Sequence, residues 1–178
     1  HYLKTQSHNA DCWPLAGISV TNNAIKLDGG NLIRNRDHAF FCDKILSENP
    51  LLSKEKLVAE LKSALGVKRV FLLPTDKNDV LGHSDGLLRI IDNTRLLVNN
   101  WTNEAYLQKL RDYLCNLGFS LIAMPYNPYK NSTWLDATGT YLNYLEFGEH
   151  IILPSYKLPE DALALAVLTK TFPKRKIS

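Results

Sequence analysis

Apolar and polar positions follow one another along this chain in an order that recurs three times. Two apolar runs separated by a polar turn predict a pair of β-strands. An amphipathic stretch that begins at a good N-cap residue and ends at a glycine predicts a helix, and a further apolar run predicts a closing strand. In the first unit these elements are strands at 25–34 and 39–46, a helix between Ser53 and Gly66, and a strand at 67–73.

The second and third units repeat this order. The second unit has predicted strands at 87–91 and 95–99, a helix capped by Thr102 and ended by Gly118, and a strand at 119–124. The third unit has strands at 141–147 and 150–154, a helix at 160–171 with Pro159 in its first turn, and residues 174–178 for a closing strand. Asn31, Gly86 and Asn143 mark the same point of the three units and are 55 and 57 positions apart, which is a repeat period.

A repeated strand–strand–helix–strand unit predicts a mixed α/β fold in which the units surround an axis and bury their helices against sheets. With 178 residues, the chain is long enough for one domain with a sizeable core. Units placed as an arc leave sheet edges exposed, so a homodimer formed through these edges is one arrangement that the pattern allows. We expect repeats at 21–75 and 76–127 and a truncated repeat at 128–178, preceded by a remnant or cap at 1–20.

Composition excludes several classes of function. The formal net charge is +3, and the basic residues form no stripe, so the sequence gives no support for nucleic-acid binding. No apolar run approaches the roughly 18 residues of a membrane span. The cysteines Cys12, Cys42 and Cys115 are odd in number and widely spaced, which is typical of reduced thiols in the cytoplasm.

Glycine-rich polar clusters lie at 28–31, at 82–86 and at 138–143. Because equivalent edges of repeated units gather in space, we expect Asp28, His83, Asp85 and Asn143 to share one pocket. Each motif alone also has a structural explanation: an aspartate before two glycines is a common turn, and residues between glycines often form a solvated loop. Their alignment at the same point of each unit favours a site. By contrast, His38 and His150 lie beside turns and are expected to be exposed.

Three stretches resemble a known family. They are Ile-Lys-Leu-Asp-Gly-Gly-Asn at 25–31, Gly-His-Ser-Asp-Gly at 82–86, and Tyr-Leu-Asn-Tyr at 141–144 followed by Ile-Ile-Leu-Pro at 151–154. In order and spacing they are similar to agmatine deiminase and the related Porphyromonas-type peptidylarginine deiminase, from about residue 20 to the end. Members of this family adopt the pentein fold, a propeller-like ring of five strand–strand–helix–strand modules. The resemblance implies that this chain is the middle three.

The resemblance also implies roles for individual residues. A guanidinium is planar and permanently charged, so two carboxylates at opposite edges suit it, and Asp28 and Asp85 would supply them. His83 would protonate the departing ammonia and then activate water, and Asn143 would hydrogen-bond the substrate or position the cysteine loop. Gly29 and Gly30 would let the backbone approach the ligand closely. In the family a cysteine thiolate attacks the guanidinium carbon, and no metal or organic cofactor takes part.

The catalytic cysteine is where the chain departs from the family pattern. The family's cysteine lies beyond the strand that residues 174–178 begin, so we expect the nucleophile beyond Ser178. Cys12, Cys42 and Cys115 are expected to be small packing thiols instead. The implied activity of the parent protein is hydrolysis of agmatine to N-carbamoylputrescine and ammonia, or of peptidylarginine to citrulline. Amidino transfer stays open, as does a non-catalytic pentein that binds a ligand or a protein partner.

Overall fold

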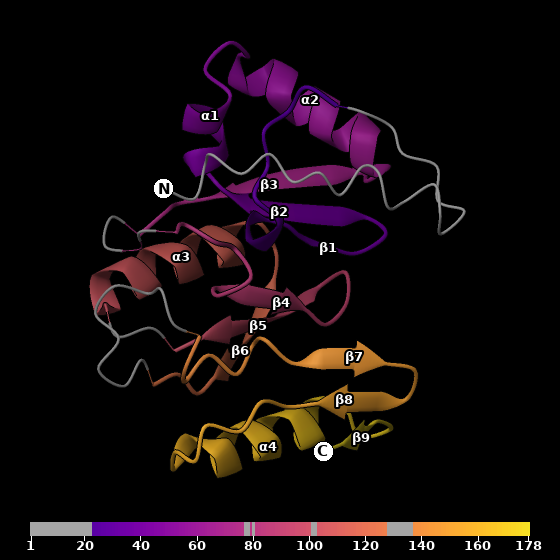
Figure 1. The fold of residues 1–178 in the computed structure, drawn as a ribbon, viewed down its shortest axis with the longest axis vertical. Helices are drawn as coiled ribbons and strands as arrows, with labels where there is room; N and C mark the ends of the chain where they lie inside the picture. The colour runs from indigo at the N-terminus through magenta and orange to yellow at the C-terminus, as the bar shows by residue number, and fades with distance from the viewer. Residues whose placement is uncertain (1–22, 77–78, 80, 101–102, 128–136) are drawn as a thin grey trace, which may run out of the picture.

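The computed structural model describes residues 23–76, 79, 81–100, 103–127 and 137–178. Nine strands form three separate three-stranded sheets in this part of the chain (Figure 1). The strands are β1 (Ile33–Arg34), β2 (His38–Cys42), β3 (Arg69–Leu73), β4 (Leu88–Ile90), β5 (Arg95–Asn99), β6 (Ser120–Met124), β7 (Leu145–Phe147), β8 (His150–Ile152) and β9 (Lys176–Ile177). The helices are α1 (Lys44–Glu48), α2 (Lys54–Leu65), α3 (Glu104–Asn116) and α4 (Glu160–Thr171).

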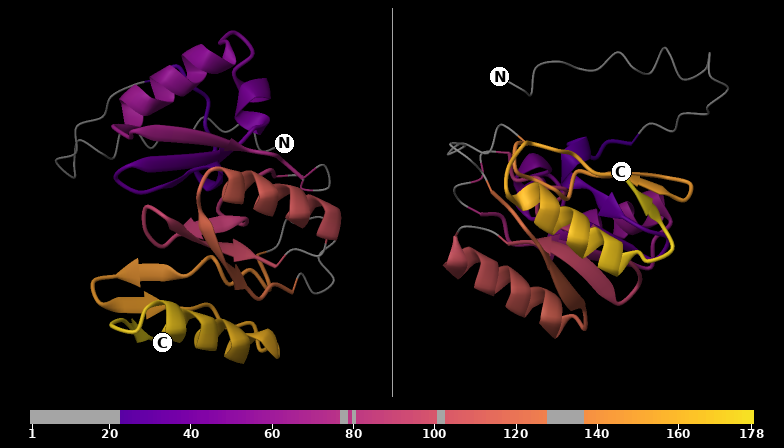
Figure 2. Two further views of the ribbon diagram at one scale, coloured as in Figure 1. Left: turned by 180° about the vertical axis from the view of Figure 1, so that it is seen from behind. Right: turned by 90° about the horizontal axis from the view of Figure 1, so that it is seen from below.

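Each sheet has the same topology. The first two strands of a unit pair antiparallel, and the third strand pairs parallel with the second. A parallel pair needs a crossover connection, and α2, α3 and α4 supply it in turn. The predicted α/β fold of three strand–strand–helix–strand repeats is confirmed, and the units follow one another along the long axis of the molecule (Figures 1 and 2).

Neighbouring units share apolar cores, and this fixes how their loops meet. Phe40 and Phe71 of the first sheet belong to one buried cluster with Leu96 of the second sheet and Leu110 of α3. On its other face the first sheet packs under α2. The second sheet contributes Leu97 to a further cluster with residues of the third unit and α4. Since the units are joined by packing, the loops that precede β1 and β4 are held side by side.

The helix boundaries follow the expected capping chemistry. The Ser53 side chain accepts a hydrogen bond from the Lys56 backbone N–H, and α2 ends at Gly66 in the left-handed conformation with φ +64°. At α3 the Asn103 side chain caps the helix by accepting from the Tyr106 backbone N–H. The cap predicted there, Thr102, lies outside the described residues.

Three expectations about local structure were wrong. The strand predicted at 25–34 is a 3₁₀ turn at Gly29–Asn31 followed by the two residues of β1. The strand predicted at 39–46 ends at Cys42, because the Asp43 side chain accepts from the N–H and hydroxyl of Thr75 and the chain turns into α1. The strand predicted at 141–147 begins only at Leu145.

His38 is buried rather than exposed. Its side chain lies in β2, where every residue is buried, and its ring makes edge contacts with Phe71 and Phe119. The Nε2 atom lies 2.9 Å from Nη2 of Arg69. The expectation from its position beside a turn was wrong because β2 lies between α2 and the second unit, so neither face meets water.

Candidate functional site

Asp28 is placed by the turn that it caps. Its side-chain Oδ1 accepts a hydrogen bond from the Gly30 backbone N–H at 3.2 Å, at the start of the 3₁₀ turn Gly29–Asn31. An aspartate followed by glycines favours this local arrangement, because its short side chain bonds to its own backbone two residues on. The second oxygen, Oδ2, is left to face the second unit.

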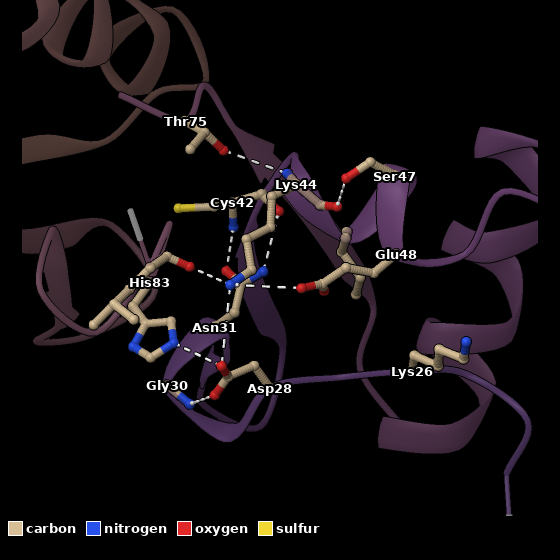
Figure 3. A network of polar contacts seen from close by, with 12 residues as sticks. Lys26, Asp28, Gly30, Asn31, Cys42, Lys44, Ser47, Glu48, Thr75 and His83 are labelled. Atoms are coloured by element: carbon tan, nitrogen blue, oxygen red, sulfur yellow. Dashed lines mark hydrogen bonds and ion pairs between the residues drawn. The ribbon is translucent and has the colours of Figure 1, made fainter. Parts of the chain in front are cut away.

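His83 meets Asp28 from the second unit. Its Nε2 lies 2.8 Å from Asp28 Oδ2, although the two residues are 55 positions apart (Figure 3). The ring lies against Gly30, where an added Cβ would come within 2.8 Å of His83 Cε1 and 2.9 Å of Cγ. The Asp85 backbone N–H donates to the Gly30 carbonyl at 3.1 Å. The structure therefore brings the clusters at 28–31 and 82–86 into direct contact.

The two aspartates have opposite pKa shifts. Burial raises the pKa of Asp85 above its ordinary 3.8, and the charge of His83 opposes this only in part. Burial also acts to raise the pKa of Asp28, but hydrogen bonds from His83 and Gly30 and the charge of Lys44 outweigh it and lower the pKa below 3.8. Asp28 is therefore ionised near neutral pH and acts only as an acceptor.

Lys44 belongs to this cluster and was not predicted from the sequence. Its Nζ donates to the Leu81 carbonyl and lies 3.5 Å from Glu48 Oε1 and 4.0 Å from Asp28 Oδ2 (Figure 3). The sequence carries no spacing signal for it, because the residue falls where a strand was expected. The turn at Asp43, which starts α1, directs this lysine toward Asp28.

The remaining predicted site residues lie differently. Asn143 is exposed, and its backbone N–H donates to the Thr140 carbonyl. Gly29 is exposed and has open space where a side chain would be, whereas Gly30 touches His83. Asn31 is buried and has a structural role. Its side-chain oxygen accepts a hydrogen bond from the Cys42 backbone N–H at 2.6 Å, and its side-chain nitrogen donates to the Cys42 carbonyl at 3.3 Å.

Neither of the two described cysteines has the character of a nucleophile poised at this cluster. Cys42 is fully buried, and burial, together with the charges of Asp79 and Asp43, raises the pKa of its thiol far above the ordinary value. A thiol that stays protonated is inert. Cys115 is exposed on α3, and Cys12 lies outside the described residues. Within the described ranges no three His, Cys, Asp or Glu side chains are grouped so as to hold a metal ion.

Comparison with known proteins decides the family. The model of the Porphyromonas-type peptidyl-arginine deiminase family matches residues 3–178. The chain belongs to this family. Agmatine deiminase of Pseudomonas fluorescens is 28% identical over 196 aligned residues, which cover 90% of this chain and 51% of that protein. Agmatine deiminase of Ectopseudomonas mendocina is 26% identical with the same coverage. The chain thus spans about half the length of these curated relatives.

Solved structures agree with the family. A C. jejuni agmatine deiminase with substrate bound is 25% identical and superimposes with a TM-score of 0.79, over 95% of this chain and 55% of that one. Agmatine deiminase of Enterococcus faecalis is 20% identical and superimposes with a TM-score of 0.76, over 94% of this chain and 56% of that chain. At this identity the match shows a similar fold and no more. The pentein superfamily expected from the sequence motifs is confirmed.

Proposed function

We propose that this chain supplies the carboxylate and histidine side of a site that hydrolyses the guanidinium group of agmatine. The products would be N-carbamoylputrescine and ammonia. The observation that carries the proposal is the 2.8 Å contact between His83 and Asp28, with Asp85 anchored beside it through Gly30. Agmatine is favoured over peptidylarginine because both curated relatives are agmatine deiminases.

The proton chemistry follows from the Asp28–His83 pair. Ionised Asp28 accepts only, so the histidine nitrogen facing it, Nε2, carries the proton of their hydrogen bond. Nδ1 is then the nitrogen that exchanges a proton with the substrate. We propose that His83 acts first as the imidazolium and gives its Nδ1 proton to the departing ammonia, which leaves a neutral ring with its remaining proton on Nε2, facing Asp28; Nδ1 then takes a proton from the attacking water and restores the imidazolium. Asp28 holds the ring and its tautomer while this happens.

The guanidinium would be held chiefly by Asp85. Both oxygens of Asp28 already accept hydrogen bonds, from Gly30 and His83, so Asp28 has fewer lone pairs left for a ligand. Asp85 is partly buried, and a carboxylate out of water binds a planar cation with paired, charge-assisted hydrogen bonds. Asn143 remains a proposed substrate contact. The proposed chemistry uses no metal or organic cofactor.

We propose that the thiolate for the covalent step comes from another segment. Burial of Cys42 removes it as a candidate, and Cys115 lies on a helix surface. We propose that the nucleophile lies beyond Ser178, in the part of the fold that the longer relatives contain. Residues 1–178 alone would then bind the guanidinium without forming a ureido product, which is the behaviour of a ligand-binding pentein.

Three further features of the protein are proposed. We place the protein in the cytoplasm because its described cysteines are unpaired, and we propose no nucleic-acid partner. A homodimer through sheet edges is proposed because β7, at the edge of the third sheet, is exposed along its whole length. The described residues contain no helix that is both long and apolar enough to cross a membrane.

Ammonia release from agmatine tests the proposal in the protein at its full encoded length. His83→Ala is expected to abolish release while circular dichroism shows the fold unchanged, and Asp85→Asn is expected to raise KM because it removes the charge that holds the guanidinium. Turnover of His83→Ala at the wild-type rate would refute the assignment. Agmatine binding without any ammonia from the full-length protein would favour the non-catalytic alternative.

A further inference from the structure

Lys44 connects the first two repeats at the centre of the proposed site. Its side chain leaves the first residue of α1 and crosses to loop 81–86 of the second unit, where Nζ donates to the Leu81 carbonyl (Figure 3). The same ammonium lies between the carboxylates of Glu48, at 3.5 Å, and Asp28, at 4.0 Å. Only 22% of the side chain is exposed, so these contacts are partly shielded from water.

The path of the lysine side chain is built into the fold. Gly82 has φ +60°, and a Cβ on it would come within 2.7 Å of Lys44 Cδ, so the glycine leaves room for the aliphatic part of the lysine. The Lys44 backbone N–H donates to Thr75 Oγ1 at 3.3 Å, which fixes where the side chain starts. A salt bridge between surface residues four positions apart, like the one between Lys44 and Glu48, requires neither a glycine at position 82 nor the hydrogen bond to Thr75.

We propose that Lys44 is a positioning residue that ties loop 81–86 to the Asp28 turn and so holds His83 in its hydrogen bond with Asp28. The ammonium offers three donors, and the Leu81 carbonyl and Glu48 fix its position. A cationic ligand therefore meets an Asp28 whose charge is already shared with Lys44 and His83. The next step rests on the proposed function: because Asp28 is engaged by Lys44 and His83, Asp85 is the carboxylate that anchors the guanidinium.

Titration of the Asp28 carboxyl carbon by NMR tests the role without any ligand. Lys44→Met is expected to raise the pKa of Asp28, since it removes a positive charge that lowers it. Lys44→Gln, which keeps a donor for Leu81 but not the charge, is expected to raise it as well. Lys44→Arg is expected to hold the pKa close to that of the wild type. The control Lys26→Met alters an exposed lysine two residues before Asp28, whose side chain lies apart from the cluster, and should leave the titration unchanged (Figure 3).

Two results would overturn the proposal. In the first, the pKa of Asp28 stays the same in Lys44→Met and in Lys44→Gln. In the second, the pKa of Asp28 rises as much in Lys44→Arg as it does in Lys44→Met. A second arm measures agmatine binding by calorimetry. If Lys44 positions the loop, Lys44→Met binds several-fold more weakly and Lys44→Arg recovers the affinity.

The binding arm separates this proposal from the one it rests on. Loss of like-charge repulsion alone would make Lys44→Met bind agmatine more tightly, so tighter binding contradicts a positioning role. A wild-type chain that does not bind agmatine contradicts the proposed function. In that case the ligand-free titration of Asp28 still decides the role of Lys44.

Discussion

Replacement of Gly30 by alanine is expected to break the contact between Asp28 and His83 while the backbone stays in place. Gly30 does not have a positive φ, so alanine can adopt its conformation. The obstacle is the imidazole ring of His83, since the new Cβ would lie 2.8 Å from Cε1 and 2.9 Å from Cγ. Unstrained carbon contacts are about 3.5–4.0 Å. The ring must therefore retreat by roughly 1 Å.

That displacement sets the size of the effect. Moving the ring off Gly30 lengthens the 2.8 Å contact between Nε2 and Asp28 Oδ2 and disrupts that hydrogen bond. Overpacking of this kind destabilises a fold by about 1–3 kcal/mol. We expect the low end of that range, because 38% of the Asp28 side chain is exposed and water can replace the lost donor. The pKa of Asp28 should rise, since the hydrogen bond from His83 is one of the contacts that lower it.

Gly29→Ala is the matched control. Gly29 is the neighbouring residue of the same turn, it is exposed, and nothing lies within 4 Å of the position of a Cβ. Its unfolding free energy in urea should change by no more than about 0.5 kcal/mol, and the Asp28 titration should match the wild type. If Gly30→Ala and Gly29→Ala have equal unfolding free energies and equal Asp28 titrations, the packing of His83 on Gly30 is refuted.

Three other properties can be predicted from the structure. A thiol reagent at neutral pH should label exposed Cys115 well before buried Cys42, whose raised pKa keeps it protonated, and peptide mass spectrometry that finds Cys42 labelled first would contradict this. Burial lowers the pKa of His38 below its ordinary 6.5, so the native state binds fewer protons than the unfolded state. The stability contributed by this residue is therefore complete above pH 6.5 and falls as the pH drops below it. The unfolding free energy of His38→Gln, measured in urea, should lose part of this pH dependence. Asn31→Ala should lower the unfolding free energy by about 1–3 kcal/mol, because it leaves both buried backbone groups of Cys42 unpaired.

The repeat order could be predicted because it depends on local signals. Periodicity identified every helix of twelve or more residues in the described chain, and the capping residues Ser53 and Gly66 lie where the sequence placed them. The meeting of Asp28 with His83 was expected because the glycine-rich clusters that contain them lie at the same point of their repeats. Repetition in the sequence thus carried long-range information that single motifs did not.

Other features depend on tertiary contacts that leave no local pattern. Lys44 reaches Asp28 only because Asp43 bonds Thr75, 32 positions away, and ends the strand early. His38 is buried because two units close on β2 from both sides. Asn143 occupies the equivalent point of its unit, yet it is exposed at a turn rather than enclosed.

An NMR chemical-shift map of the chain with agmatine and with putrescine tests whether the cluster recognises a guanidinium group. The two ligands carry the same charge, but only agmatine has a guanidinium group. If the cluster of Asp28, His83 and Asp85 binds a guanidinium, agmatine should shift the signals of His83 and Asp85 saturably, and putrescine should leave them unchanged. Equal shifts with both ligands, or shifts confined to residues outside the cluster, would contradict the account.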